Sequence, residues 1–167
     1  NEIRILTDEG AECPAGATGE LFVRNSALVS YHKDDGATAG SMRDGFFSVG
    51  DLAHVDARGL FHIDGRKRDM IISGGVNVYP AEVEEVLHAH PDVGEAAVVC
   101  VADADLGERV RAFVAPREGR TIDTTELIAF CKARLSGPKV PRDVRVLPEL
   151  PKNPTGKVLK RELERGR

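Results

Sequence analysis

The stretch that decides the fold is GRKRDMIISGGVNVYPAEVEEVL, residues 65–87. It opens with a charged segment and continues with two short apolar runs on either side of Gly74 and Gly75. A pair of glycines tolerates the positive φ angles of a tight hairpin turn. Pro80 suits the first position of a helix, where its missing N–H costs nothing, and apolar residues then recur at helical spacing. The stretch therefore predicts a joint, a hairpin and a helix at the start of a compact unit.

The remainder of the chain after this helix alternates between strand and helix patterns. Asp123 is expected to be the N-cap of a helix whose apolar face continues until Gly137 stops it. Three segments have the pattern of strands: 95–101, 109–115 and 144–147. A short terminal helix is expected over residues 158–164. This composition of elements predicts a compact α+β domain.

The first part of the chain has short strand patterns joined by glycine-containing turns. Ile3 and Ile5 alternate with polar residues, and a similar pattern recurs near residues 21–23, 46–47 and 60–63. A short helix is expected over residues 34–43. Several short strands of this kind predict a small antiparallel β-barrel-like subdomain. Because Asn1 falls inside an alternating pattern, we expect the chain to be a fragment of a longer one.

The composition of the 167 residues excludes several classes of protein. A hydrophobic content of 41% with 30% charged residues is typical of a globular protein. A net charge of −4 argues against nucleic acid as a main partner, because phosphate binding needs a basic surface. The longest apolar run, residues 96–102, has only the length of a strand, so no transmembrane segment is predicted. The three widely spaced cysteines and the lack of a signal peptide indicate free thiols and a cytoplasmic location.

Two residues near the joint have the chemistry of nucleotide binding. Asp51 follows Gly50, and a carboxylate there suits the 2′ and 3′ hydroxyls of a ribose, since charge-assisted hydrogen bonds are the stronger ones. An aspartate that caps its own turn is the alternative. Arg66 offers a planar fork of donors for ribose and phosphate oxygens. Residues 66–69 could equally be a solvated charge run.

The segment PKNPTGK, residues 151–157, is of a different kind. Its prolines and glycine predict an extended arm that presents Lys157 away from regular structure. It is not a P-loop, because Val158 follows where Ser or Thr is required. An ammonium group on such an arm could neutralise negative charge that develops in a site formed elsewhere. An ordinary solvated lysine is the alternative.

These segments together resemble acyl-CoA synthetases of the fatty-acid–CoA ligase type, within the superfamily of adenylate-forming enzymes. The match extends over nearly the whole chain, in the family's order, through residues 19–21, 48–52, 65–84 and 151–157. The resemblance implies that the chain is the C-terminal portion of a longer enzyme. Residues 1–65 would then end a large N-terminal adenylation domain, which is otherwise missing, and residues 66–167 would form a mobile C-terminal domain. The version of the joint in this chain resembles bacterial fatty, medium-chain or aryl acid ligases more than acetate enzymes.

The resemblance also implies the reaction and its residues. A carboxylic acid, a fatty acid in the first instance, would react with Mg²⁺-ATP to give acyl-AMP and then with CoA to give acyl-CoA; the magnesium ligand would lie upstream, outside this chain. The implied roles are adenylation for Lys157, ribose binding for Asp51 and Arg66, lining of the thioester-forming arrangement for Gly74 and Gly75, and the hinge for Arg68. Arg68 departs from the Asp or Lys that is more usual at the pivot, and Val49 from the usual Thr.

Two further expectations follow from this interpretation, and two alternatives to it stay open. The isolated chain should have no appreciable synthetase activity, because the phosphate loop and acyl pocket would lie upstream. A lysine acetyltransferase acting on Lys157 would silence adenylation by removing its charge. Two alternatives stay open: an adenylating enzyme that passes the acyl group to a carrier protein or oxidises it, and a non-catalytic interaction module.

Overall fold

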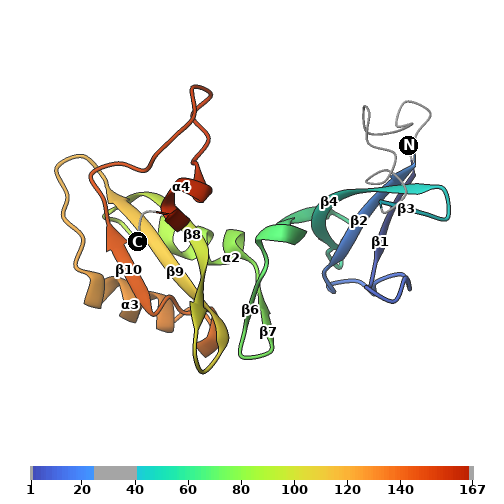
Figure 1. The fold of residues 1–167 in the computed structure, drawn as a ribbon, viewed down its shortest axis with the longest axis horizontal. Helices are drawn as coiled ribbons and strands as arrows, with labels where there is room; N and C mark the ends of the chain where they lie inside the picture. Colours follow the sequence, from blue (N-terminus) through green and yellow to red (C-terminus); the bar gives the residue numbers. More distant parts are fainter. Residues whose placement is uncertain (1, 25–40, 166–167) are drawn as a thin grey trace. The chain divides into compact units, whose positions relative to one another are not determined.

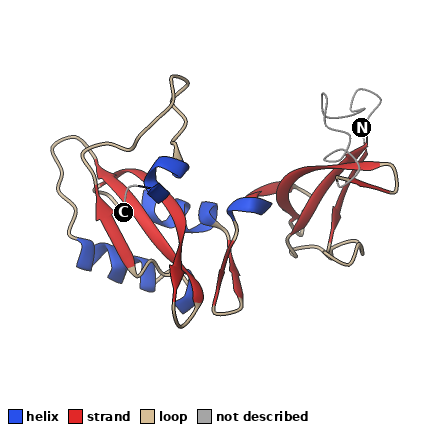
Figure 2. Cartoon of the chain, in the orientation of Figure 1, coloured by secondary structure: helices blue, strands red, loops and turns tan. Residues whose placement is uncertain are grey.

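The computed structural model describes residues 2–24 and 41–165. The chain divides into two compact units, Asn1–Arg68 and Asp69–Arg167. The division falls between Arg68 and Asp69, whereas the sequence-based boundary lies between residues 65 and 66. Among the residues that the structure describes, strands outnumber helices in both units (Figure 2). Within the described ranges, no helix is long and apolar enough to cross a bilayer.

The first unit is a curled antiparallel sheet of five strands (Figure 1). Its strands are β1 (Glu2–Leu6), β2 (Gly19–Arg24), β3 (Met42–Arg43), β4 (Phe46–Val55) and β5 (Phe61–Arg66). The order is β1-β2-β4-β3, and β5 pairs with β4. The register shifts between Glu20 and Phe22 in β2, and between Leu52 and Ala53 in β4. Such irregularities bend strands and re-aim side chains, and here they flank the segment that contains Asp51.

The core of the first unit is small and lies on both faces of the sheet. One cluster contains Ile5, Leu21 and Ala53, and the other contains Leu6, Phe22 and Phe46. Because neighbouring residues of one strand are both buried, the simple alternation expected for a flat sheet does not hold. Ile3, expected on a half-buried strand, is 48% exposed.

The prediction of a helix over residues 34–43 is wrong for the part of this segment that the structure describes. Residues 34–40 lie outside the described residues, and Met42–Arg43 form strand β3. Asp44 and Gly45 follow this strand with φ angles of 50° and 77° and let the chain turn back into β4. The polar, glycine-containing sequence therefore ends in a hairpin.

The second unit is an α+β fold, as expected. Its elements are β6 (Ile71–Ser73), β7 (Val76–Val78), α2 (Pro80–His88), β8 (Val93–Asp103), β9 (Gly107–Pro116), α3 (Thr124–Lys132), β10 (Asp143–Val146) and α4 (Lys160–Arg165), with short 3₁₀ turns η1 (Lys67–Asp69) at the boundary and η2 (Gly137–Lys139). The sheet order is β10-β9-β6-β7, with β8 paired to β9. The β9–β10 pair is parallel and the others are antiparallel.

Strand β8 is buried on both faces, which gives the second unit three layers. Ala96 and Val98 belong to the core that contains the apolar faces of α2 and α3. Ala97 and Val99 belong to the opposite core, which includes Leu163 of α4. Successive side chains of a strand point to opposite faces, so a continuous apolar run satisfies both cores.

The joint-proximal elements match their sequence signals. Gly74 and Gly75 have φ angles of 55° and 79° and form the turn between β6 and β7. Pro80 is at the start of α2, as predicted. Helix α3 begins at its predicted N-cap, Asp123, but ends at Lys132 instead of continuing towards Gly137.

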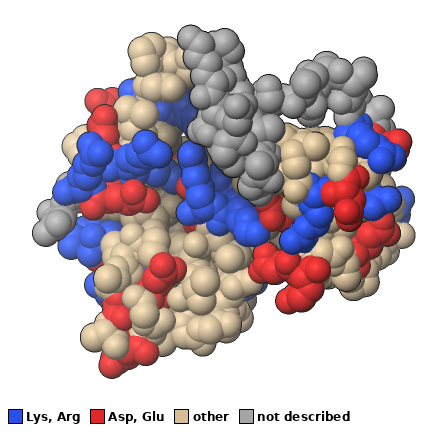
Figure 3. All heavy atoms as spheres, turned by 45° about the vertical axis from the view of Figure 1, so that its right-hand side comes forward, with Lys and Arg blue, Asp and Glu red and all other residues tan. Residues whose placement is uncertain are grey.

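The surface of the molecule is mixed in sign. Figure 3 shows basic and acidic side chains side by side on the visible face, and neither sign covers it alone. This mixture agrees with the small net charge of −4.

The N-cap of α3 provides a test of the second unit. The Asp123 carboxylate accepts hydrogen bonds from the backbone N–H groups of Thr125 and Glu126, at 2.7 and 3.2 Å. We expect Asp123→Ala to lower the free energy of unfolding by about 1 kcal/mol, the usual cost of a lost N-cap. Urea denaturation followed by circular dichroism measures the change. Glu149→Ala, which removes an equal charge from an exposed loop, should leave the stability within about 0.5 kcal/mol.

Candidate functional site

Asp51 and Arg66 lie opposite each other on β4 and β5. They are register partners in the antiparallel pair, and Arg66 Nε lies 2.9 Å from Asp51 Oδ1. Arg66 also donates a hydrogen bond of 3.0 Å to the carbonyl of Val49. The Asp51 side chain is 23% exposed and that of Arg66 is 50% exposed. The pair therefore presents an anchored carboxylate and an accessible guanidinium at the end of the first unit.

A second polar network, which the sequence did not predict, lies beside this pair. Glu20 accepts hydrogen bonds from Lys67 Nζ at 2.7 Å and from the hydroxyl of Ser48. Asp8 binds the same ammonium group at 2.9 Å. The hydrogen bonds that the Lys67 ammonium donates to Glu20 and then to Asp8 raise the pKa of Lys67 above its ordinary value. Burial raises the pKa of Glu20, but the bonds from Lys67 and Ser48 outweigh it and leave that pKa lowered.

The glycine turn of the second unit is held against the β8–β9 loop. The N–H of Gly74 donates to the carbonyl of Leu106 at 3.1 Å. A Cβ atom on Gly74 would lie 3.1 Å from the Leu106 side chain, whereas Gly75 has open space around it. The turn therefore exposes backbone at Gly75, where a ligand could approach closely.

Arg68 is the last residue of the first unit and lies in the 3₁₀ turn that spans the boundary. This position is compatible with the hinge expected from the sequence. The hinge role stays a prediction, because one conformation describes no rotation.

The arm between β10 and α4 ends in a tight loop, drawn as tan coil in Figure 2. The side-chain oxygen of Asn153 accepts hydrogen bonds from the backbone N–H groups of Thr155 and Lys157, at 3.1 and 2.8 Å, and from the Thr155 hydroxyl. The N–H of Asn153 donates to the carbonyl of Lys157 at 2.9 Å, and Gly156 adopts a φ of 84°. Asn153 therefore fixes the loop that carries Lys157.

The base of the arm is anchored in the second unit. Leu150 is 2% exposed and belongs to the core under α4. Lys152 pairs with Glu95 of β8 at 2.6 Å. The side chain of Lys157, by contrast, is exposed and makes no hydrogen bond or ion pair with any residue that the structure describes. The arm thus holds a solvated ammonium group on a fixed backbone.

The predicted site residues are divided between the two units. The structure brings Asp51 and Arg66 together in the first unit. Gly74, Gly75 and Lys157 belong to the second unit. Among the described residues, no group of three or more His, Cys, Asp or Glu could hold a metal ion, and the upstream magnesium site stays a prediction.

The cysteines have no apparent chemistry. Cys13, Cys100 and Cys131 are free, as expected. Cys131 is buried in the main core of the second unit. Burial raises the pKa of Cys100 to about 11, so its reactive thiolate form is suppressed.

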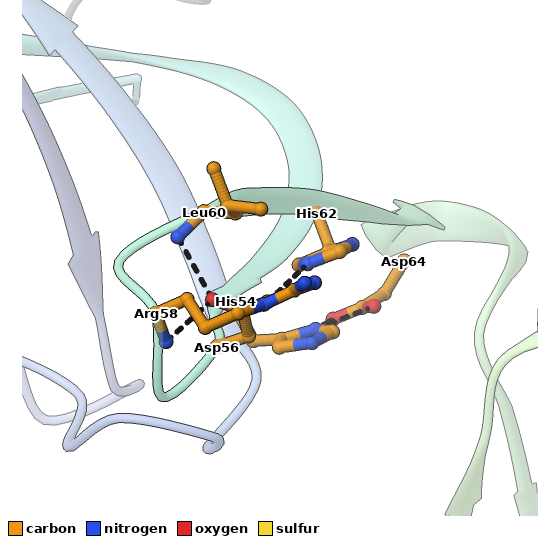
Figure 4. A network of polar contacts seen from close by, with 6 residues as sticks. All are labelled: His54, Asp56, Arg58, Leu60, His62 and Asp64. Carbon is orange, nitrogen blue, oxygen red and sulfur yellow. Dashed lines mark hydrogen bonds and ion pairs between the residues drawn. The ribbon is translucent and has the colours of Figure 1, made fainter.

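A pair of stacked histidines marks the hairpin between β4 and β5 (Figure 4). His54 and His62 are register partners whose ring centroids lie 4.9 Å apart. His54 Nδ1 lies 2.8 Å from the Asp64 carboxylate, and His62 Nε2 lies 3.2 Å from Asp56. The second oxygen of Asp64 accepts a 2.7 Å bond from the Thr18 hydroxyl. Each histidine is thus tied to its own carboxylate, and the network stabilises the hairpin.

Asp56 closes the turn of this hairpin. Its carboxylate accepts hydrogen bonds from the backbone N–H groups of Leu60 and Arg58, each at 2.9 Å. The bond from Leu60 is the main cause that lowers the pKa of Asp56 to about 2, with His62 and Arg58 adding to it.

The turn gives a pH prediction. Because the folded pKa of Asp56 lies below its ordinary value of 3.8, the carboxylate's contribution to stability is fully present above that value and is lost as the pH falls through about 2. A carboxyl ¹³C NMR titration should place the Asp56 midpoint near 2. Asp56→Asn should speed amide exchange at Leu60 at neutral pH. The control Asp105→Asn, in a loop of the second unit, should leave amide exchange at Leu60 unchanged. A titration midpoint of Asp56 near 4 would contradict the interpretation.

Most of the second unit is similar to a known domain family. Residues 82–157 match the model of the AMP-binding enzyme C-terminal domain. The matched segment begins in helix α2 and ends at Lys157. This segment of the chain is therefore similar to the C-terminal domain of AMP-binding enzymes.

The curated relatives of the whole chain are CoA ligases. The chain is 44% identical over 159 residues to an indoleacetate–CoA ligase of Aromatoleum aromaticum, covering 95% of this chain and 31% of the relative. It is 43% identical to a feruloyl-CoA synthase of an Amycolatopsis species (98% and 34% covered) and 42% identical to a long-chain-fatty-acid–CoA ligase of Bacillus subtilis (95% and 29%). The chain therefore spans about a third of the length of these relatives.

Solved structures show the same fold. ATP-bound MatB from Rhodopseudomonas palustris matches with a TM-score of 0.90 and 38% identity, over 98% of this chain and 33% of that one. The amide bond synthetase McbA from Marinactinospora thermotolerans matches with a TM-score of 0.89 and 38% identity, over 97% and 34%. The expected α+β architecture is thereby confirmed, and the relatives belong to the adenylate-forming superfamily as the sequence motifs indicated.

Proposed function

We propose that this chain is the C-terminal part of an ATP-dependent acid–CoA ligase, which converts a carboxylic acid to an acyl-adenylate and then to an acyl-CoA. The observation that carries the proposal is the arm, because the AMP-binding C-terminal domain match ends at Lys157 and that residue is an exposed cation on a fixed loop. The curated relatives, which are about three times as long, are named as CoA ligases. The remaining parts of the active site would belong to polypeptide upstream of this chain.

The first unit would supply the ribose site. Asp51 is held by Arg66, and its second oxygen can accept hydrogen bonds from the vicinal hydroxyls of a ribose. The Arg66 guanidinium is half exposed, so its remaining donors can reach ribose or phosphate oxygens. ATP would therefore bind where β5 ends before the joint, opposite the middle of β4.

The second unit would supply charge for the first half-reaction. A carboxylate oxygen of the acid attacks the α-phosphorus of ATP, and the bond to pyrophosphate breaks. The Lys157 ammonium would neutralise negative charge between the two anions as the new bond forms. Rotation about Arg68 would then withdraw Lys157 and bring the turn at Gly74 and Gly75 to the thioester-forming arrangement, where the CoA thiolate displaces AMP.

The substrate class is the least constrained part of the proposal. The relatives are named for indoleacetate, ferulate and long-chain fatty acids, so an aryl or a fatty acid is equally compatible with the chain. The joint sequence resembles fatty, medium-chain or aryl acid ligases more than acetate enzymes, and a fatty acid is retained here as one proposal. The likeness to an amide bond synthetase supports a second candidate, in which an amine and not CoA accepts the acyl group. Product analysis with CoA or an amine as acceptor separates the two.

Three other expectations from the sequence stay predictions. The exposed Lys157 side chain is accessible to a lysine acetyltransferase, and acetylation would remove the charge that the first half-reaction needs. Transfer to a carrier protein and a cytoplasmic location are further predictions. A purely non-catalytic interaction module would be supported if the upstream coding sequence lacked a phosphate-binding loop.

The longer ligase tests the role of Lys157. We expect Lys157→Met to lower acid-dependent ATP–pyrophosphate exchange by a factor of about 10²–10³, as for the loss of one charge-stabilising group in other enzymes. Thioester formation from synthetic acyl-AMP and CoA should stay within about threefold of the wild type, since the adenylate is already formed. The control Lys132→Met removes an exposed lysine of α3 and should change neither rate. Equal losses in both half-reactions would contradict the assignment.

The isolated chain gives a complementary prediction. The 167 residues alone should show no acid-dependent pyrophosphate exchange, with radiolabelled pyrophosphate as the probe. Addition of the separately expressed upstream part should restore exchange if the two parts associate. Exchange by the isolated chain would show that these residues hold a complete adenylation site and would overturn the proposed division of labour.

A further inference from the structure

The carboxylate of Glu20 is the centre of a network that reaches both members of the Asp51–Arg66 pair. One oxygen accepts the hydroxyl hydrogen of Ser48, and the other accepts Lys67 Nζ at 2.7 Å. Glu20 lies on β2, whereas Ser48 lies on β4 and Lys67 directly follows β5. The side chain of Glu20 is 19% exposed and that of its partner Lys67 is 41% exposed, so the carboxylate is largely covered while the ammonium group is reached by solvent.

The branch through Ser48 leads to Asp51. The Ser48 hydroxyl, which donates to Glu20, also accepts a hydrogen bond of 3.1 Å from the backbone N–H of Gly50. Gly50 has a φ of 72°, a conformation that side-chain-bearing residues rarely adopt. This bond holds β4 in its irregular course immediately before Asp51. The direction of the Asp51 carboxylate therefore depends on the Ser48–Glu20 contact.

The branch through Lys67 leads to Arg66. Lys67 is bound by Glu20 and by Asp8, at 2.7 and 2.9 Å, and all three residues belong to the first unit. Because Lys67 directly follows Arg66, this clamp fixes the end of β5 in the register that places Arg66 opposite Asp51. Strand ends otherwise fray, and a half-exposed arginine is free to change rotamer.

We propose that Glu20 is a positioning residue for the Asp51–Arg66 pair, and through it for the ribose hydroxyls of the nucleotide. Glu20 makes no contact with the nucleotide in this assignment, and Ser48 and Lys67 transmit its effect. The geometric part rests on the contacts above, and the nucleotide part rests on the proposed function. One oxygen of Glu20 supports Asp51 through Ser48, and the other supports Arg66 through Lys67. A side chain with only one accepting oxygen at this position should therefore disturb at least one member of the pair.

The 167-residue chain tests the geometric part. Glu20→Gln keeps the shape of the side chain but replaces one accepting oxygen by a donor, so we expect amide exchange at Gly50 to speed by about tenfold and the Arg66 Nε–H resonance to shift. Ser48→Ala should speed amide exchange at Gly50 and leave the Arg66 Nε–H resonance unchanged, because it removes only the branch through Ser48. The control is Glu12→Gln, at an exposed glutamate that pairs with Arg4 at 3.6 Å. It should change neither the amide exchange at Gly50 nor the Arg66 Nε–H resonance. An unchanged Gly50 and Arg66 in folded Glu20→Gln would overturn the positioning role.

The longer ligase tests the nucleotide part. Glu20→Gln should raise KM for ATP by about tenfold while KM for the acid stays within twofold. Lys67→Met should raise KM for ATP in the same way, whereas Lys67→Arg, which keeps the positive charge, should bring it most of the way back to the wild-type value. Equal changes in both KM values would indicate a merely structural role and overturn this part. A wild-type enzyme without acid-dependent pyrophosphate exchange would refute the proposed function and the ribose assignment with it. The amide hydrogen exchange of Gly50 and the Arg66 resonance in the 167-residue chain would still decide the positioning role of Glu20.

Discussion

The structure depends on one constraint: the residues assigned to a single reaction belong to two folding units that are joined between Arg68 and Asp69. Asp51 and Arg66 are fixed by the strands of the first unit, and Lys157 is fixed by the arm of the second. Neither core determines the distance between these groups. A reaction that needs them together must therefore be completed by rotation at the joint, by other polypeptide, or by both.

Each unit accordingly holds its own residues rigidly. The first unit has two small apolar clusters among its described residues, and it adds part-buried polar contacts such as Glu20 with Ser48 and Lys67. The second unit is built on the long β8–β9 pair, both faces of which are covered. The arm is tied to this sheet through Leu150 and through the Lys152–Glu95 pair. An exposed lysine on an anchored loop loses less entropy when it enters a site than one on a free loop.

Local signals in the sequence predicted the second unit well. The Gly74-Gly75 turn, the start of α2 at Pro80 and the Asp123 N-cap each depend on residues within a few positions of one another. The end of α3 was predicted less well, because the helix ends at Lys132 whereas the apolar spacing continues to Leu135, whose N–H still donates to the carbonyl of Cys131 at 2.8 Å. The prediction of a helix before Phe46 is wrong at Met42 and Arg43, because these two residues pair with β4 and form a strand.

The sequence by itself determined the α+β composition, because caps, turns and periodicity are encoded by near neighbours. The joint near Arg68 and the groups that the proposed reaction would use stay predictions from the same sequence. Only the tertiary structure decided which groups face one another. Glu20 meets Lys67 across 47 positions, and His54 stacks on His62 through a strand register that no local pattern specifies. Strand pairing and curvature bring such residues together, and both result from the packing of the whole sheet.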